Sequence, residues 1–324
     1  MIGQSTPAAS ALPARGALRV APTLAIIIVN YNTRQLLAAC LDALAASQVT
    51  LPLRVIVVDN ASTDGSLAML ARDYPWVETI ASPRNAGYAA ANNLALRRLL
   101  AEIPPDQDRR HAYCLLLNPD TAVAPDTLVR MVDFLEHHPE AGAAGPRLVL
   151  PDGRLDLACR RLFPTPGRAL FRLLGLSRLF PRSRLFASYN LTYLDEQAIT
   201  EVDSVVGAFM LVRVAAIDQA GLLDEDFFMY GEDLDWAYRI KQHGWRIYYA
   251  PITTVVHHKG AASRKRSTRS IIAFYQAMAI FHRKHYAPSL PALANLVILV
   301  GIIARGVLAV AINACRPAER KRVG

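Results

Sequence analysis

Cysteine is scarce in this sequence, and its spacing excludes the sites that depend on it. Only four cysteines occur among 324 residues, and all lie far apart: Cys40, Cys114, Cys159 and Cys315. Zinc sites and redox pairs need closely spaced cysteines, and a small disulfide-stapled fold needs a denser set. The sequence therefore predicts free thiols in a reducing compartment.

The N-terminus lacks the continuous apolar stretch of a signal peptide. Residues 1–22 are rich in alanine, proline and serine instead. Such a composition buries too little apolar surface to fold, so we expect a disordered tail on the cytoplasmic side. The whole chain is 52% apolar, which is enough for one large domain with a sizeable core.

Acidic residues are almost missing from the last part of the chain. From His257 to the C-terminus, twelve Lys and Arg accompany a single acid, Glu319, so this part carries about +11 and the remainder about −2 of the net +9. Residues 160–184 also lack acids and contain seven arginines. Basic stretches of this kind bind nucleic acid or an anionic membrane surface, or form an ordinary solvated face.

A long apolar segment near the C-terminus favours the membrane over nucleic acid. Residues 292–314 contain one charge, Arg305, and are about long enough to cross a bilayer. On a helix, Asn295, Arg305 and Asn313 fall within an arc of about 80°, which makes a narrow polar stripe. We therefore expect a helix that lies in the membrane interface, with its basic flanks at anionic headgroups. A soluble core helix and a contact with a second copy of the chain are the alternatives.

The N-terminal half alternates apolar strands with helices, as a parallel α/β sheet requires. Residues 24–32 form a predicted strand and residues 34–47 a helix, and residues 54–66 repeat the unit with a second helix that begins near Ser66. Such a βαβ pair binds ligands at the carboxyl ends of its strands. The polar residues at that edge, each of which is alternatively a turn former, are Asn30, Asn32, Asp59 and Asn60.

Two further units add polar groups to the same edge. Residues 82–93 pass through a glycine turn into an alanine-rich helix, which places backbone N–H groups with Arg84 and Asn85 where a diphosphate would bind. The next apolar strand ends with Asn118 and Asp120. Their oxygens can share a hard cation with phosphate oxygens, or can form an Asx turn.

Three carboxylates at the start of a predicted helix are the strongest candidates for catalysis. Glu232, Asp233 and Asp235 follow an aromatic turn that contains Gly231. Acids at this position can take a proton during a reaction, or can simply cap the helix.

Residues 205–214 are a predicted buried strand in which Gly207 leaves room for a sugar, or a plain core strand. Residues 160–199 show no clear pattern, and we interpret them as an insertion on the acceptor side rather than a separate domain.

In combination, these motifs resemble the family-2 glycosyltransferases of GT-A fold, especially the rhamnosyltransferase-like branch. The resemblance rests on IIIVNYN, VVDNASTDGS, NAGYAAANN, LLLNPD, GLLDEDFFMYGEDLDWAYRIKQHGW and VVHHKGAAS, in that order, over about residues 23–265. It implies a Rossmann-like domain with a mostly parallel central sheet. It also implies an inverting transfer from a dTDP- or UDP-sugar that uses Mg²⁺ or Mn²⁺.

The resemblance also implies roles for individual residues. Asp233 would be the general base, with Glu232 and Asp235 shaping its position and ionisation. Asp120 would hold the metal, and His257 would complete the metal site or touch the diphosphate. The usual Asp-x-Asp motif is Asn118-Pro119-Asp120 here, which removes one charge. Asp59 would contact the nucleotide base, within a predicted donor-binding set of Val29, Asn30, Asn32, Asp59, Arg84, Asn85, Asn93 and Asn118.

The predicted organisation is a tail at residues 1–22, a GT-A domain at residues 23–265 and a helical membrane-associating region at residues 266–324. The expected reaction moves rhamnose or a similar hexose to a lipid-linked glycan acceptor in cell-envelope polysaccharide synthesis. We expect a peripheral or monotopic protein at the cytoplasmic face of the membrane, with no nucleic-acid partner. A second copy of the chain is a further candidate partner.

Two other functions fit parts of the same pattern. A sugar nucleotidyltransferase would also bind a nucleotide at this edge, but it would carry a glycine-rich, basic loop where this chain has VNYNTRQ. A non-catalytic, membrane-bound scaffold that binds sugar nucleotides would keep the pocket without needing Asp233.

Overall fold

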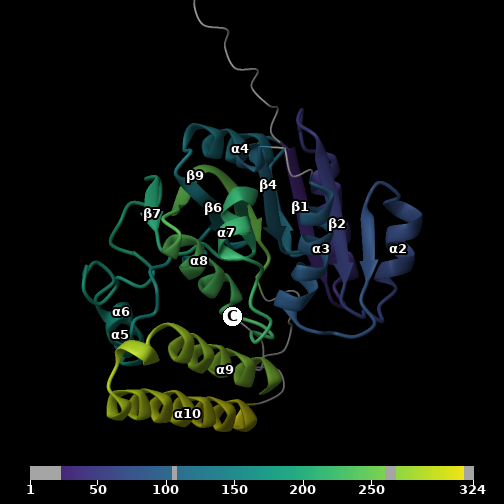
Figure 1. Ribbon diagram of the computed structural model, residues 1–324. Helices are drawn as coiled ribbons and strands as arrows, with labels where there is room; N and C mark the ends of the chain where they lie inside the picture. Colours follow the sequence, from purple (N-terminus) through teal and green to yellow (C-terminus); the bar gives the residue numbers. More distant parts are fainter. Residues whose placement is uncertain (1–22, 104–107, 260–267, 317–324) are drawn as a thin grey trace, which may run out of the picture.

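The computed structural model describes residues 23–103, 108–259 and 268–316 (Figure 1). The predicted tail at residues 1–22, the end of the VVHHKGAAS motif and the basic residues after 316 lie outside the described residues.

One mixed sheet of nine strands forms the centre of the described part of the chain. Its order is β3-β2-β1-β4-β8-β6-β9-β5, and β7 also pairs with β9. The strands are β1 (Thr23–Asn30), β2 (Leu53–Asp59), β3 (Glu78–Ala81), β4 (Ala112–Leu117), β5 (Thr121–Ala122), β6 (Ala141–Val149), β7 (Thr200–Val202), β8 (Phe209–Arg213) and β9 (Arg246–His257). The first four strands along this order are parallel, and β8 runs antiparallel between β4 and β6. The predicted α/β fold is confirmed.

Helices pack on the sheet and extend beyond it at one end. They are α1 (Arg34–Ala45), α2 (Ser66–Asp73), α3 (Tyr88–Glu102), α4 (Thr127–His137), α5 (Pro166–Leu173), α6 (Leu176–Leu179), α7 (Val214–Ala220), α8 (Glu232–Gln242), α9 (Thr268–His285) and α10 (Ala292–Cys315). Short 3-10 turns occur at η1 (Arg109–His111), η2 (Leu157–Cys159) and η3 (Ala287–Ser289). Both α5 and α6 lie in the predicted insertion.

The strand register brings the polar residues after β1, β2 and β4 to one edge of the sheet. Asn30 at the end of β1 is paired with Asp59 at the end of β2, and Ile28 is level with Leu117 at the end of β4. All three strands are parallel and almost wholly buried, so their carboxyl ends meet at the same edge. The amide of Asn118 donates to the Ala208 carbonyl at 3.0 Å, which brings the start of β8 to this edge as well.

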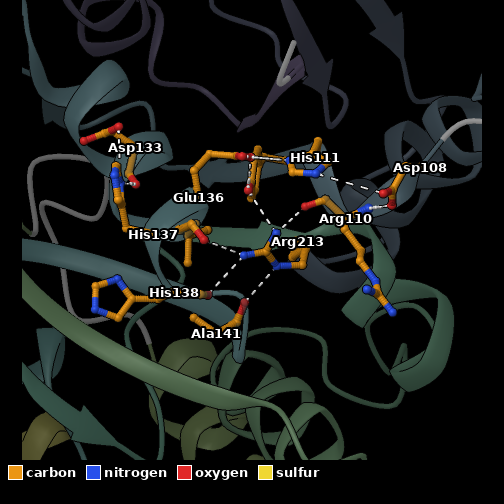
Figure 2. Close-up of polar contacts among 11 residues, drawn as sticks. Asp108, Arg110, His111, Asp133, Glu136, His137, His138, Ala141 and Arg213 are labelled. Carbon is orange, nitrogen blue, oxygen red and sulfur yellow. Dashed lines mark hydrogen bonds and ion pairs between the residues drawn. The ribbon is translucent and has the colours of Figure 1, made fainter. Parts of the chain in front are cut away.

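The opposite edge of the sheet is held by the buried Arg213, as Figure 2 shows. Its guanidinium donates to the carbonyls of Ala141 (3.0 Å), Leu135 (2.6 Å) and His138 (3.2 Å) and to the Tyr113 hydroxyl (3.0 Å). Two of these carbonyls end α4, where a cation stabilises the last turn of a helix. This polar cluster therefore fastens α4 to the sheet and is structural.

A pair of helices, α9 and α10, lies below the sheet domain, with α9 between α10 and α8 (Figure 1). Asn295 of the predicted polar stripe turns toward α9. Its Nδ2 donates to the Ala287 carbonyl at 2.9 Å, and its Oδ1 lies 3.0 Å from His282 Nε2. Gly306 packs against the Tyr275 ring so closely that an added Cβ would lie 3.1 Å from the ring, a tight contact.

The outward face of α10 is apolar over its whole length, with Leu293, Val297, Ile303 and Val307 all more than 60% exposed. Its 24 residues span about 36 Å, and the helix is long and apolar enough to cross a membrane. None of its most apolar stretch is buried within the described part of the chain, so it is not a core helix of this domain.

Candidate active site

One buried hydrogen-bond cluster holds the turns after β1 and β2. Asn30 Nδ2 donates to Asp59 Oδ1 at 2.8 Å, and the Ser62 amide donates to Asp59 Oδ2 at 2.9 Å. The Thr33 hydroxyl donates to Asn30 Oδ1 at 2.6 Å. Asn30 and Asp59 are fully buried. Each oxygen of Asp59 accepts one hydrogen bond that holds a turn and keeps a second acceptor position, so the base contact stays a prediction.

Val29 and Asn32 shape the same turn. Val29 is buried in β1, and Asn32 adopts a left-handed conformation with φ of 54°. Asn32 Oδ1 accepts from the Thr63 amide at 2.7 Å, which ties the first turn to the second. Tyr31, which the sequence did not single out, is 47% exposed beside them. An exposed aromatic ring at this edge is suited to stacking on a nucleotide base.

The loop before α3 is tied to the turn after β2. Asn60 Nδ2 donates to Asn85 Oδ1 at 3.0 Å, and the Ala86 amide donates to Asn60 Oδ1 at 3.1 Å. Asn85 Oδ1 also accepts from the Gly87 amide at 3.1 Å. Arg84 is exposed on this loop. The structure therefore places Asn85 in the loop scaffold and leaves Arg84 as the accessible cation predicted for the diphosphate.

The start of α3 contacts the chain segment that precedes α8. The Tyr88 amide donates to the Phe228 carbonyl at 2.8 Å. Further along α3, the side chain of Asn93 is buried and both donates to and accepts from the Leu223 backbone, at 2.8 and 3.1 Å. The polar atoms of Asn93 thus fix the loop before α8, and its contact with the donor stays a prediction.

Asp120 and His257 meet where β5 pairs with β9. His257 Nε2 lies 3.4 Å from Asp120 Oδ1, and both side chains are buried. Asp156, which the sequence analysis missed, binds His257 Nδ1 through Oδ2 at 2.9 Å and Lys259 Nζ through Oδ1 at 2.8 Å. His258 is exposed, as strand alternation predicts.

Opposing effects set the charges in this cluster. Burial lowers the pKa of His257, but hydrogen bonds to Asp120 and Asp156 outweigh it and raise the pKa to about 9. Burial raises the pKa of Asp156, but the hydrogen bond from His257 and the charge of Lys259 hold it well below the usual range. Asp156 therefore acts as a fixed anion that orients His257 Nε2 toward Asp120.

Asp120, and His257 once its imidazole has lost its proton to the binding of a cation, are donors that suit Mg²⁺ or Mn²⁺. Asn118 lies two residues before Asp120. The described residues contain no cluster of three or more His, Cys, Asp or Glu side chains spaced as metal ligands. Such a cation would therefore rely on phosphate oxygens and water for the rest of its shell, as Mg²⁺ commonly does. The metal site stays a prediction.

Asp233 is buried at the start of α8, where three donors hold its carboxylate. Arg161 Nη2 lies 2.8 Å and the Gly207 amide 3.0 Å from Oδ2, and the Leu234 amide donates to Oδ1 at 2.8 Å. A carboxylate has about four lone-pair sites, two on each oxygen. One acceptor position, on Oδ1, is therefore left over for a substrate proton.

Glu232 lies beside Asp233 and differs from it in charge. Burial, together with repulsion from Asp233, raises the pKa of Glu232 to about 8. Its Oε2 is buried and accepts no hydrogen bond from the described residues. Tyr88, whose hydroxyl donates to the Gly207 carbonyl at 3.0 Å, faces both acids, and burial and their charge raise its pKa. At neutral pH, Glu232 is thus a neutral acid next to the Asp233 carboxylate.

Asp235 points away from this pair. It is 1% exposed, and its carboxylate binds Arg239 Nε at 2.8 Å and His285 Nε2 at 2.7 Å. Its side chain thus fastens α9 to α8, and its part in shaping the base stays a prediction.

The fold is shared with solved glycosyltransferases. The chain superposes on mannosyltransferase PcManGT from Pyrobaculum calidifontis, solved in complex with GDP-Man and Mn²⁺, with a TM-score of 0.54 over 93% of this chain and 78% of that one. At 21% identity this likeness shows the fold alone. The molecule is thus of GT-A fold, the class of glycosyltransferase that its sheet edge and acids define. A family model described as "Glycosyltransferase like family 2" matches residues 21–273, so the protein belongs to glycosyltransferase family 2.

Rhamnosyltransferases are among its relatives. The chain is 29% identical over 260 residues to N-acetylglucosaminyl-diphospho-decaprenol L-rhamnosyltransferase of Mycobacterium tuberculosis (strain ATCC 25618 / H37Rv). The matched stretch covers 80% of this chain and 83% of that protein. It is 26% identical over 237 residues to rhamnosyltransferase WbbL of Escherichia coli (strain K12), with 72% and 82% covered. The resemblance inferred from the motifs is confirmed.

Proposed function

We propose that the protein is an inverting glycosyltransferase that moves rhamnose or a related hexose from a dTDP- or UDP-sugar to a hydroxyl of a lipid-linked glycan. The names of its relatives in Mycobacterium tuberculosis and Escherichia coli support rhamnose as the sugar, and the first of these names supports an isoprenoid diphosphate acceptor. The observation that carries the proposal is the buried Asp233 carboxylate, which keeps one acceptor position on Oδ1.

The reaction follows from this carboxylate. The acceptor hydroxyl oxygen attacks the anomeric carbon, the bond from that carbon to the diphosphate oxygen breaks, and the nucleoside diphosphate leaves. Asp233 Oδ1 takes the hydroxyl proton as the new bond forms. A single displacement of this kind inverts the anomeric configuration, because the nucleophile enters opposite the leaving group.

The donor would lie along the carboxyl edge of the sheet. Tyr31 is placed to stack on the base, and Arg84 to pair with the diphosphate. Asp120 and His257 would hold a divalent cation at the same diphosphate, where its charge stabilises the leaving group.

The outer face of α10 would lie in the hydrocarbon at the cytoplasmic face of a membrane. The face is apolar over about 36 Å, and basic residues flank it at Arg283 and Arg316, whereas Lys284 is paired with Asp224 and Asp226. Cations at the ends of such a helix meet anionic headgroups, worth about 1 kcal/mol each near the surface. This placement would bring a lipid-linked acceptor close to α8, because a single helix, α9, separates α8 from α10 (Figure 1).

The test is transfer by the full chain in lipid nanodiscs. We expect a product from an N-acetylglucosaminyl isoprenoid diphosphate and one donor among dTDP-rhamnose, UDP-glucose and UDP-galactose, with the anomeric configuration inverted by NMR. Donor binding without transfer in any of these pairs would favour the scaffold, and formation of a new nucleotide sugar would favour a nucleotidyltransferase. A retained configuration would refute the mechanism.

A further inference from the structure

Arg161 reaches the catalytic carboxylate from outside α8, and the proposed mechanism assigns it no role. Its Nη2 lies 2.8 Å from Asp233 Oδ2, and both side chains are less than 10% exposed. The backbone of Arg161 is fixed, because it forms an isolated antiparallel bridge with Ser204 and its amide donates to the Ser204 carbonyl at 3.0 Å. The guanidinium also donates to the Val205 carbonyl at 2.8 Å.

The geometry points to a role for this contact. We propose that Arg161 is a positioning residue that orients Asp233 and keeps it ionised beside Glu232, so that Oδ1 faces the acceptor hydroxyl. This inference rests on the proposed function, in which Asp233 is the base. Arg161 and the Gly207 amide together occupy Oδ2. Without Arg161, only the backbone amides of Gly207 and Leu234 hold the carboxylate, and one acceptor position on Oδ2 is no longer filled.

The electrostatic part of the role comes from the groups that face Asp233. Glu232 is its neighbour on α8, Tyr88 faces it from α3, and Arg161 is the cation that pairs with it. Two adjacent buried carboxyls tend to share one proton. A cation on one of them decides which acid is charged, and here it is bonded to Asp233 and not to Glu232.

The same short segment connects the base to the acceptor side of the molecule. Arg161 is next to the start of the insertion. The Phe163 ring contacts the tilted ring of Tyr238 of α8, with 4.9 Å between centroids, and its centroid lies 6.4 Å from that of Phe281 of α9. The segment that contacts the base thus also contacts α8 and α9.

Arg160 provides a matched control. It is also an almost fully buried arginine, but its guanidinium donates to the carbonyls of Asp195 (2.7 Å) and Leu194 (3.0 Å) and lies over the Tyr249 ring. It therefore packs the insertion without contacting an acid of the site. If replacing an arginine lowered activity only by loosening the insertion, then replacing Arg160 and replacing Arg161 would lower it equally.

The experiment measures kcat against pH for Arg161→Gln, Arg161→Lys and Arg160→Gln, with the folded fraction and donor affinity of each. We expect Arg161→Gln to lower kcat at pH 7 at least tenfold with unchanged donor affinity, and to move the acid limb of its profile to higher pH, so that activity recovers as the pH rises. Arg161→Lys keeps a cation and should fall between Arg161→Gln and wild type, with its acid limb moved less.

Arg160→Gln should keep the wild-type pH profile. If Arg160→Gln and Arg161→Gln lose the same activity with no change in profile, Arg161 is structural and the inference is overturned. If Asp233→Asn is inactive while folded Arg161→Gln matches wild type, the inference is also overturned but the proposed base stands. An active Asp233→Asn would instead refute the proposed base itself.

Discussion

Replacing Glu232 by glutamine should remove a loss of stability that the wild type suffers as the pH rises. The difference in the free energy of unfolding between variant and wild type should therefore move in favour of the variant with increasing pH. The pKa of Glu232 is raised from the ordinary value of 4.5 to about 8 in the folded protein. Between pH 4.5 and about 8, folded Glu232 therefore keeps its proton, whereas Glu232 of the unfolded chain has lost it. The folded state therefore binds more protons than the unfolded state between these values, and the free energy of unfolding falls with increasing pH. Glutamine keeps the shape of the neutral acid and has no proton to lose.

The size of the effect follows from this window. Each pH unit within it changes the free energy of unfolding by up to about 1.4 kcal/mol, which amounts to about 5 kcal/mol across the whole window from 4.5 to about 8. Thermal unfolding between pH 4.5 and 9 measures it, as the difference in Tm between Glu232→Gln and wild type. The slope of this difference is the quantity to compare, because the buried amide adds an offset that does not depend on pH.

A suitable control is Glu140→Gln. Hydrogen bonds from its own backbone amide and from Tyr248 outweigh burial and lower the pKa of Glu140, so its contribution is present above the unfolded value and is lost only in acid. Its variant should therefore gain nothing relative to wild type as the pH rises. A difference in Tm between Glu232→Gln and wild type that stays flat from pH 5 to 8 would refute the charge assignment of the two acids.

Further predictions concern the cation, α9 and α10. In calorimetry, Asp120→Ala should weaken the binding of Mn²⁺ and of the donor together. Asp156→Asn should weaken Mn²⁺ binding roughly 10–100-fold. Unchanged affinities in these variants would refute a cation site at Asp120 and His257. Asp235→Asn should lower the free energy of unfolding by about 3–5 kcal/mol, since a buried partner loses its anion, and a kcat loss in the fully folded variant would show that Asp235 also acts on the base. Val300→Lys should lower vesicle binding roughly 100-fold, because placing a lysine in the hydrocarbon costs about 2.5–3.5 kcal/mol. The control Leu94→Lys, on α3, should leave vesicle binding unchanged. Equal flotation of the two variants with vesicles would contradict the membrane contact of α10.

The sheet and its polar edge were predictable because they follow from local pattern. Continuous apolar runs such as β1 and β4 have few alternatives to a buried parallel strand. Once the strands are parallel, the polar residues that follow them must share one edge, so the meeting of Asn30 with Asp59 needed no tertiary information. The mixed second half of the sheet was not predicted, because no local signal sets the direction of β8.

The roles within the site were harder to predict, because they depend on partners far away in the sequence. Asp233 and Asp235 lie two positions apart on one helix and so point in nearly opposite directions. The sequence cannot say which of them faces the site, since Arg161 is 72 residues from Asp233 and His285 is 50 residues from Asp235. Asp156 was missed for the same reason, with 101 residues between it and His257.

The most direct test of the account is the turnover of Asp233→Asn in nanodiscs, measured with donor affinity on the same sample. The amide keeps the shape of the side chain but cannot take the hydroxyl proton, so we expect kcat to fall by about 10²–10⁴ while the donor Kd changes little. A folded variant that keeps more than about a tenth of the wild-type turnover would contradict the assignment of Asp233 as the base, because loss of a general base costs at least about 10².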